Sequence, residues 1–225
     1  MREYTEDVAR SSPTAEAGMT VRKSGPGAWV AAATATVGGV LLGVLTNLAQ
    51  GWLPGDWNQL ANSAAVWSAV AFAAGALIAR RGTLLRAALG GLGAETGLVA
   101  GYYGYAEFGR DGMGALLFPL VWLAMACVAG PLFGVAAYAW RRGRGIRSRT
   151  AGLAAFAGLF GMEAMTAARD LHHTAQAWTC GTAFLLIPLL MAPTHRVRAL
   201  TLAAAVPCAL LAYAIVGLPL KAVSS

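Results

Sequence analysis

The chain has 225 residues, of which 57% are hydrophobic and 12% are charged, and its formal net charge is +7. An ordinary soluble domain carries about 25% charged residues, so the composition excludes that class. The basic residues stand in short clusters between apolar runs, which is typical of membrane topology and unlike a nucleic-acid-binding face. The three cysteines, Cys127, Cys180 and Cys208, lack the spacing of a disulfide framework.

The order of polar and apolar segments predicts one tail and one membrane domain. Residues 1–25 are polar and of mixed charge, which predicts a disordered cytoplasmic tail. Residues 26–220 predict an all-α, polytopic membrane bundle of seven transmembrane helices, since each apolar run has the length of about 20 residues that a bilayer requires. The expected spans are 28–49, 62–79, 87–106, 113–140, 150–168, 175–193 and 199–218.

Basic residues predict the orientation of these spans. With a cytoplasmic N-terminus, fourteen Lys and Arg residues fall in the tail and the inner loops, and three fall outside. The outer three are Arg110, Arg169 and Lys221. This asymmetry follows the positive-inside rule, so we expect the C-terminus outside.

Two of the expected spans carry a carboxylic acid near the middle. These acids are Glu95 in the third span and Glu163 in the fifth. An ionisable group at membrane depth is costly and therefore indicates a functional site. Apolar surroundings favour the neutral acid, which is a competent proton donor. The alternative is that each glutamate only joins helices through hydrogen bonds, with Thr46, Asn47, Ser68 or a freed carbonyl as partner.

Glycines recur at spacings of three and four in the third expected span, at Gly93, Gly97 and Gly101. Such a stripe lets two helix backbones approach closely, so we expect it to pack on another helix. Glu95 lies on the opposite side of the helix. Tyr102 shares the face of Glu95, because seven residues are almost two helical turns.

Aromatic side chains accompany both acids and predict a shared chamber for a hydrophobic guest. Helical spacing places Glu163 on one face with two rings, the hydroxyl of Thr166 and a second acid, Asp170. Ring faces stabilise cations. The aromatic candidates for substrate contact are Tyr102, Tyr103, Trp122, Phe156 and Phe160. Asn47, with Gln50, Asn58 and Asn62, predicts a polar outer mouth.

Several kinds of chemistry lack their motif. His172 and His173 follow Asp170, but adjacent histidines point in different directions and no H-E-x-x-H is present, so we expect no metal site. The sequence also contains neither a nucleotide-binding P-loop nor the G-x-S-x-G of a serine hydrolase. Both lysines, Lys23 and Lys221, lie outside the expected spans, which excludes a retinal Schiff base. We therefore expect no cofactor.

Three stretches resemble a known family of small integral membrane proteins. They are LTNLAQGWLPGDWNQLANSAAVWSAVAF (residues 45–72), GLVAGYYGYAEFGRDGMGALLFPLVWLAMA (residues 97–126) and GPLFGVAAYAWRRGR (residues 130–144). The family they resemble is actinobacterial and is known only as a domain of unknown function. This resemblance implies a multi-pass protein of the bacterial plasma membrane, and it implies no catalytic residue.

The size, the seven expected spans and the two membrane acids are also similar to the small membrane-bound terpene cyclases. These include fungal meroterpenoid cyclases and bacterial cyclases of prenylated indoles. Members of that group protonate an alkene or epoxide with a buried carboxylic acid and guide the cation through an aromatic pocket. The likeness is one of architecture and rests on no shared motif.

We therefore expect an enzyme of isoprenoid secondary metabolism that cyclises a prenylated lipophilic substrate by protonation. Glu95 or Glu163 would donate the proton, and Asp170 would tune the donor or take the final proton. The expected partners are the lipophilic substrate and membrane lipids, with no nucleic acid. Two alternatives remain open at this point: a small proton-coupled transporter or substrate-binding membrane subunit, and a structural or regulatory membrane protein.

Overall fold

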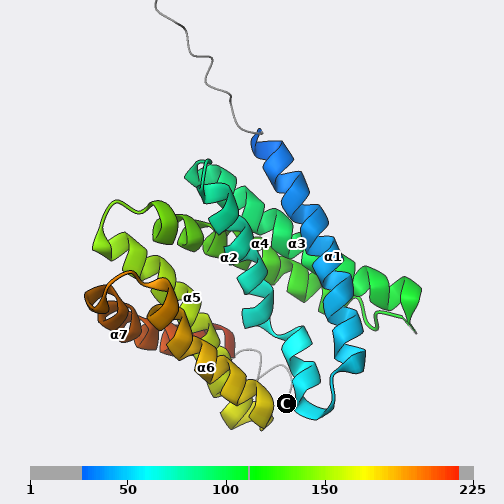
Figure 1. Ribbon diagram of the computed structural model, residues 1–225. Coiled ribbons are helices and arrows are strands. Elements are labelled where there is room, and N and C mark those ends of the chain that lie inside the picture. The colour runs from blue at the N-terminus through cyan, green and yellow to red at the C-terminus, as the bar shows by residue number, and fades with distance from the viewer. Residues whose placement is uncertain (1–26, 111, 218–225) are drawn as a thin grey trace, which may run out of the picture.

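Helices account for nearly all of residues 27–110 and 112–217, which the computed structural model of the protein describes (Figure 1). Residues 1–25, predicted to be a disordered tail, lie outside the described part. The α-helices of the described part are α1 (Ala28–Trp52), α2 (Ala64–Ala79), α3 (Leu84–Gly109), α4 (Leu117–Arg142), α5 (Ile146–Thr166), α6 (Thr174–Met191) and α7 (His195–Ala212). Shorter segments are the 3₁₀-helix η1 (Gly55–Asn62) and the π-helical η2 (Ala167–Leu171) and η3 (Tyr213–Gly217).

The described helices confirm the all-α prediction and support a membrane protein, but not every expected span has the properties of one. In the described ranges, five segments are long and apolar enough to cross a membrane. They are Trp29–Trp52, Leu117–Arg142, Ile146–Leu171, Thr174–Met191 and His195–Gly217. The other two expected spans correspond to α2, which has 16 residues, and to α3, which is long enough but less apolar.

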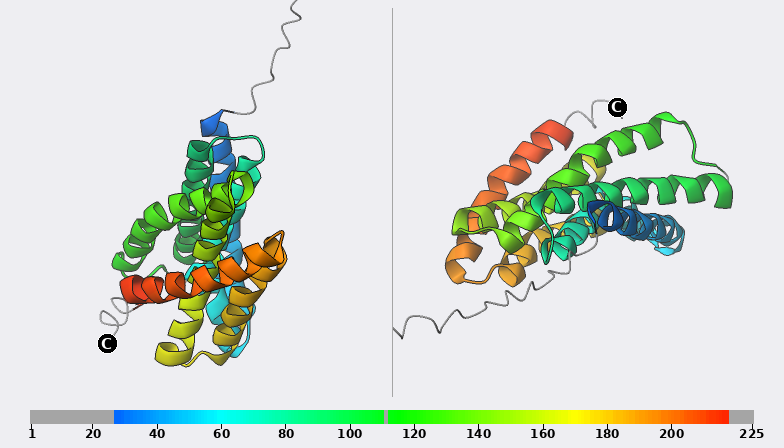
Figure 2. Two further views of the ribbon diagram at one scale, coloured as in Figure 1. Left: turned by 90° about the vertical axis from the view of Figure 1, so that its left-hand side faces the viewer. Right: turned by 90° about the horizontal axis from the view of Figure 1, so that it is seen from above.

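The helices pack as two groups. In the first group, α3 contacts α1, α2 and α4, and in the second, α5 contacts α6 and α7. Figures 1 and 2 show α1 and α7 on opposite sides of the bundle, with α4 and α5 joining the two groups. Helix α2 also contacts both groups, because it packs on α3, α4 and α5. This central position brings α2 to both glutamates.

Helices α1 and α3 lie unusually close together because glycines line their contact. A Cβ atom at Gly97 would overlap the carbonyl of Thr36, and one at Gly101 would overlap the carbonyl of Val40. Gly39 on α1 faces the backbone of α3 in the same way. The predicted glycine stripe is therefore confirmed as a helix-packing surface. It fixes the rotation of α3 and so places Glu95 on the side that faces α2.

This packing predicts opposite effects for two glycine substitutions on α3. We expect Gly101→Ala to lower the free energy of unfolding by about 1–3 kcal/mol, because the new methyl group would force the helices apart. Gly104→Ala serves as the matched control, since nothing lies within 4 Å of the position that its methyl group would take. At position 104, alanine should leave the free energy of unfolding unchanged or raise it by up to about 1 kcal/mol. The free energies of unfolding of the two variants would be measured in detergent. Equal stability would contradict the role of the glycine stripe as a helix-packing surface.

Candidate functional site

Glu95 is buried in the middle of the first helix group, with 5% of its surface exposed. Its Oε1 accepts a hydrogen bond of 3.0 Å from the hydroxyl of Ser68 on α2. Its Oε2 is buried and has no hydrogen-bond partner among the described residues. Ser68 was one of the partners expected for a helix-joining glutamate. The second oxygen takes no part in that contact.

A cluster of aromatic rings follows Glu95 along the same face of α3. Trp67 of α2 lies at its centre, with ring centroids 5.2 Å from Tyr102 and 4.9 Å from Trp122. Tyr103 adds an edge contact to Tyr102 at 5.1 Å. The structure thus brings together three of the predicted aromatic residues. Trp67 was missed, although its place beside Ser68 in an apolar run was a usable signal.

Glu163 has a different environment, although it is equally buried, with 6% of its surface exposed. Its Oε2 accepts from the backbone N–H of Ala65 at 2.6 Å, and its Oε1 accepts from Nε2 of Gln176 at 2.7 Å. Ala65 lies in the first turn of α2, two positions after the N-cap residue Ser63. Both carboxyl oxygens are therefore engaged as acceptors, and Glu163 caps the start of α2 from another helix. It is less free than Glu95 to deliver a proton.

The two acids approach α2 one turn apart, at Ala65 and Ser68, but their aromatic neighbours belong to separate clusters. Phe156 stacks on Phe72 with a centroid distance of 4.1 Å and meets Phe160 edge-on at 5.4 Å. This phenylalanine cluster lies in the core formed with the second helix group. The tyrosine–tryptophan cluster beside Glu95 is distinct from it. The predicted aromatic residues thus belong to two clusters, one beside each acid.

A hydrogen-bond chain leads from Glu163 to the N-terminal end of α6. Gln176 donates a hydrogen bond to Glu163 through its Nε2. The Oε1 of Gln176 lies 3.3 Å from Nδ1 of half-buried His173. Gln176 was not singled out in the sequence, although an amide near the start of an apolar span was the available signal. The chain connects a buried acid with a titratable side chain near the helix end.

Asp170 lies in η2, and Asn47 lies in the last two turns of α1. The Asp170 carboxylate accepts a hydrogen bond of 2.9 Å from the hydroxyl of Tyr213, which ties η2 to η3. The side-chain amide of Asn47 donates to the backbone carbonyl of Tyr102 at 3.1 Å, and the backbone carbonyl of Asn47 accepts from the Arg110 guanidinium at 2.8 Å. Asn47 therefore belongs to a polar network near the end of α1 and does not line a described pocket.

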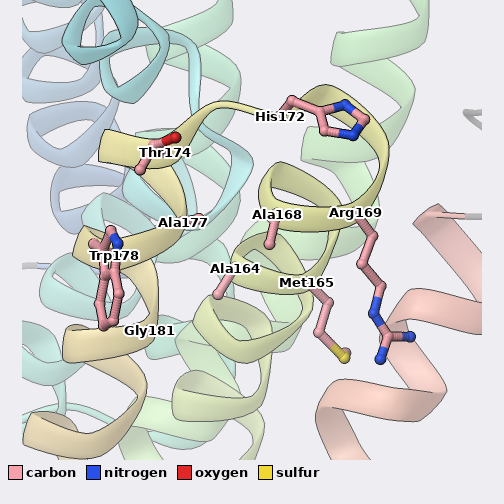
Figure 3. Close-up of a pocket in the computed structure, with 9 residues that line it drawn as sticks. All are labelled: Ala164, Met165, Ala168, Arg169, His172, Thr174, Ala177, Trp178 and Gly181. Carbon is pink, nitrogen blue, oxygen red and sulfur yellow. The ribbon is translucent and has the colours of Figure 1, made fainter.

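A pocket of about 550 Å³ lies against α5, η2 and α6 (Figure 3). Neither glutamate lines it. Ala164 of α5 and Ala168 of η2 form one side of it, and helical geometry places that side away from Glu163. Within the described ranges, no group of three or more His, Cys, Asp or Glu side chains is arranged to hold a metal ion.

A family model described as a family of unknown function, DUF6518, matches residues 22–222. The chain belongs to this family. The match covers all of the described helices of this DUF6518 protein, and it confirms the resemblance of the sequence to an uncharacterised domain family. No curated protein and no solved structure matches the chain.

Proposed function

We propose that the protein is a membrane-embedded enzyme that cyclises a prenylated, lipophilic substrate, with Glu95 as the proton donor. The observation that carries the proposal is the environment of this acid. Glu95 is buried, one of its oxygens has no partner among the described residues, and aromatic rings continue along its face. A neutral carboxyl in such a place has the properties of an acid catalyst.

The proposed reaction needs a single proton and returns it. The Glu95 O–H bond breaks as its proton adds to one carbon of an alkene, and the π electrons form the new C–H bond. A second π bond of the substrate then attacks the resulting cation and closes a ring. Loss of a proton to a carboxylate completes an isomerisation, so no redox partner is required. Ser68 orients the acid, and the faces of Trp67, Tyr102 and Trp122 stabilise the cation.

We further propose that all seven α-helices cross the bacterial plasma membrane, with the N-terminus inside and the C-terminus outside. Helix α3 is surrounded by α1, α2 and α4, so it faces protein more than lipid and tolerates its polar residues. Ten of the twelve arginines of the described part lie in the loops after α2, α4 and α6 or in the helix turns that flank these loops, which supports a cytoplasmic position for them. The loop after α3 and the η2 segment hold Arg110 and Arg169.

Solvent deuterium tests the proposed protonation. Membranes containing the protein would be incubated with prenylated indoles or prenylated quinols in D₂O, and products would be analysed by mass spectrometry and NMR. We expect a cyclised isomer that carries one deuteron on the carbon that was protonated. Ring formation without deuterium would contradict acid initiation. A complete lack of conversion across both substrate classes would count against the cyclase proposal.

A proton-coupled transporter is the second candidate, and one observation favours it. The chain from His173 through Gln176 to Glu163 links a buried acid with the end of the bundle. Protein reconstituted in liposomes with a pH-sensitive dye inside distinguishes the two functions. Solute-dependent proton entry that disappears in His173→Ala and Glu163→Gln would support transport. Proton entry that is independent of any solute, or unchanged in both variants, would oppose it.

A further inference from the structure

The pocket against α5, η2 and α6 is an open groove with an apolar interior and a basic rim. Ala164, Ala168 and Gly181 leave space between the helices, because none of them carries a long side chain. Figure 3 shows Trp178 of α6 on one side of this groove and Met165 of α5 on the other. The groove is therefore shaped to take a flexible hydrocarbon chain rather than a compact polar solute.

The basic rim consists of Arg169 of η2 and His172 at the C-cap of η2, and Figure 3 shows the side chain of Arg169 running beside that of Met165. Among the residues that the structure describes, no acidic side chain lines the groove. Asp170, the nearest acid in the sequence, accepts a hydrogen bond from Tyr213. The rim thus carries positive charge that is complementary to an anion.

The position of the groove fits the boundary between the hydrocarbon core and the headgroups. Trp178 is 75% exposed, and an exposed tryptophan near a helix end is typical of the membrane interface. The backbone of His172 is left-handed, with φ of 57°, and ends the π-helical turn just beyond the apolar walls. The apolar walls thus extend from the basic rim toward the middle of α5 and α6.

From this arrangement we infer that the groove binds one molecule of an anionic phospholipid of the bilayer. One acyl chain lies along Ala164, Ala168 and Gly181, and the phosphate meets Arg169 through charge-assisted hydrogen bonds, with His172 beside it. The inference does not depend on the proposed cyclase, since neither glutamate lines the groove. A lipid headgroup is favoured over free phosphate because the apolar walls continue from the rim.

Native mass spectrometry of the full chain in detergent, with added dioleoyl phosphatidylglycerol or dioleoyl phosphatidylcholine, tests this site. We expect wild-type protein to hold phosphatidylglycerol roughly 10-fold more tightly than phosphatidylcholine, because both lipids carry the phosphate but the choline ammonium of the second is repelled by the basic rim. Gly181→Leu should reduce phosphatidylglycerol binding about 10-fold or more by filling the groove. The fold should tolerate leucine there, because a Cβ atom at Gly181 meets only Ala164, at 4.0 Å.

The controls separate groove filling from general effects. Gly38→Leu adds the same side chain on α1, where a Cβ atom meets nothing within 4 Å, and should leave lipid binding unchanged. Arg169→Gln should make the two lipids bind equally, whereas Arg142→Gln on exposed α4 surface should not. Equal binding of the two lipids to wild type would overturn the inference. So would unchanged binding in Gly181→Leu, or displacement of the lipid by millimolar inorganic phosphate.

Discussion

The Glu95→Gln variant is expected to keep its fold and to cyclise the substrate about 10²–10⁴-fold more slowly than wild type, since this is the usual contribution of a general acid to the rate. The amide has nearly the same volume as the acid, and its oxygen can still accept from Ser68. Its N–H groups are far too weak as acids to protonate an alkene. Initial rates in membranes, with the amount of folded protein measured in parallel, would report the effect.

The control for this experiment is the other acid of α3. Glu107 is exposed near the end of the helix, where its carboxylate accepts from the backbone of Met113. Glu107→Gln should therefore turn over substrate at the wild-type rate. Ser68→Ala should lie between the two, because it disturbs the orientation of Glu95 and leaves the acid in place. Wild-type turnover by Glu95→Gln would remove Glu95 from the proposed mechanism.

Local periodicity was sufficient to predict the geometry of α3. Gly97 and Gly101 fall on one stripe of the helix, and Glu95 and Tyr102 fall on another, whatever the neighbouring helices are. The structure adds that α1 covers the glycines and that Ser68 and Trp67 of α2 face the other side. Spacing along one helix fixes which residues share a face, so this part of the site followed from the sequence.

The surroundings of Glu163 did not follow from spacing, because its partners come from distant segments. Ala65 precedes it by 98 positions and contributes only a backbone N–H, which no sequence pattern marks. Likewise, the length rule suggested a span over 62–79, yet Asn62 still belongs to η1 and the helix starts at Ala64. The first residue of α2 depends on the capping of its N-terminal N–H groups, and Glu163 of α5 completes this capping.

The same reasoning explains why a single aromatic chamber was expected and two clusters were found. Phe156 and Phe160 share a helix with Glu163, so spacing alone made them its companions. Phe72 of α2 instead stacks on Phe156 and draws this cluster into the core between the helix groups. Which rings touch depends on helix pairing, and the apolar composition of these helices leaves that pairing open.

Glu163→Ala is expected to cause the largest loss of stability among the variants considered, about 2–6 kcal/mol from two orphaned donors. Removal of the carboxylate leaves the Ala65 N–H and the Gln176 amide buried without acceptors. Each unsatisfied donor costs about 1–3 kcal/mol. The loss should appear as a lower free energy of unfolding in mixed micelles titrated with a denaturing detergent.

A double-mutant cycle with Gln176→Ala assigns this loss to its cause. Gln176→Ala alone removes one donor but leaves Glu163 capping α2, so its cost should be smaller, and the double variant should lose less than the sum of the single variants. Glu107→Ala, at an exposed site, should stay within about 0.5 kcal/mol of wild type. Because α2 also carries Ser68, fraying of its first turn in Glu163→Ala should slow turnover in proportion to the unfolded fraction. A Glu163→Ala protein as stable as wild type but inactive would instead assign Glu163 a direct part in the chemistry.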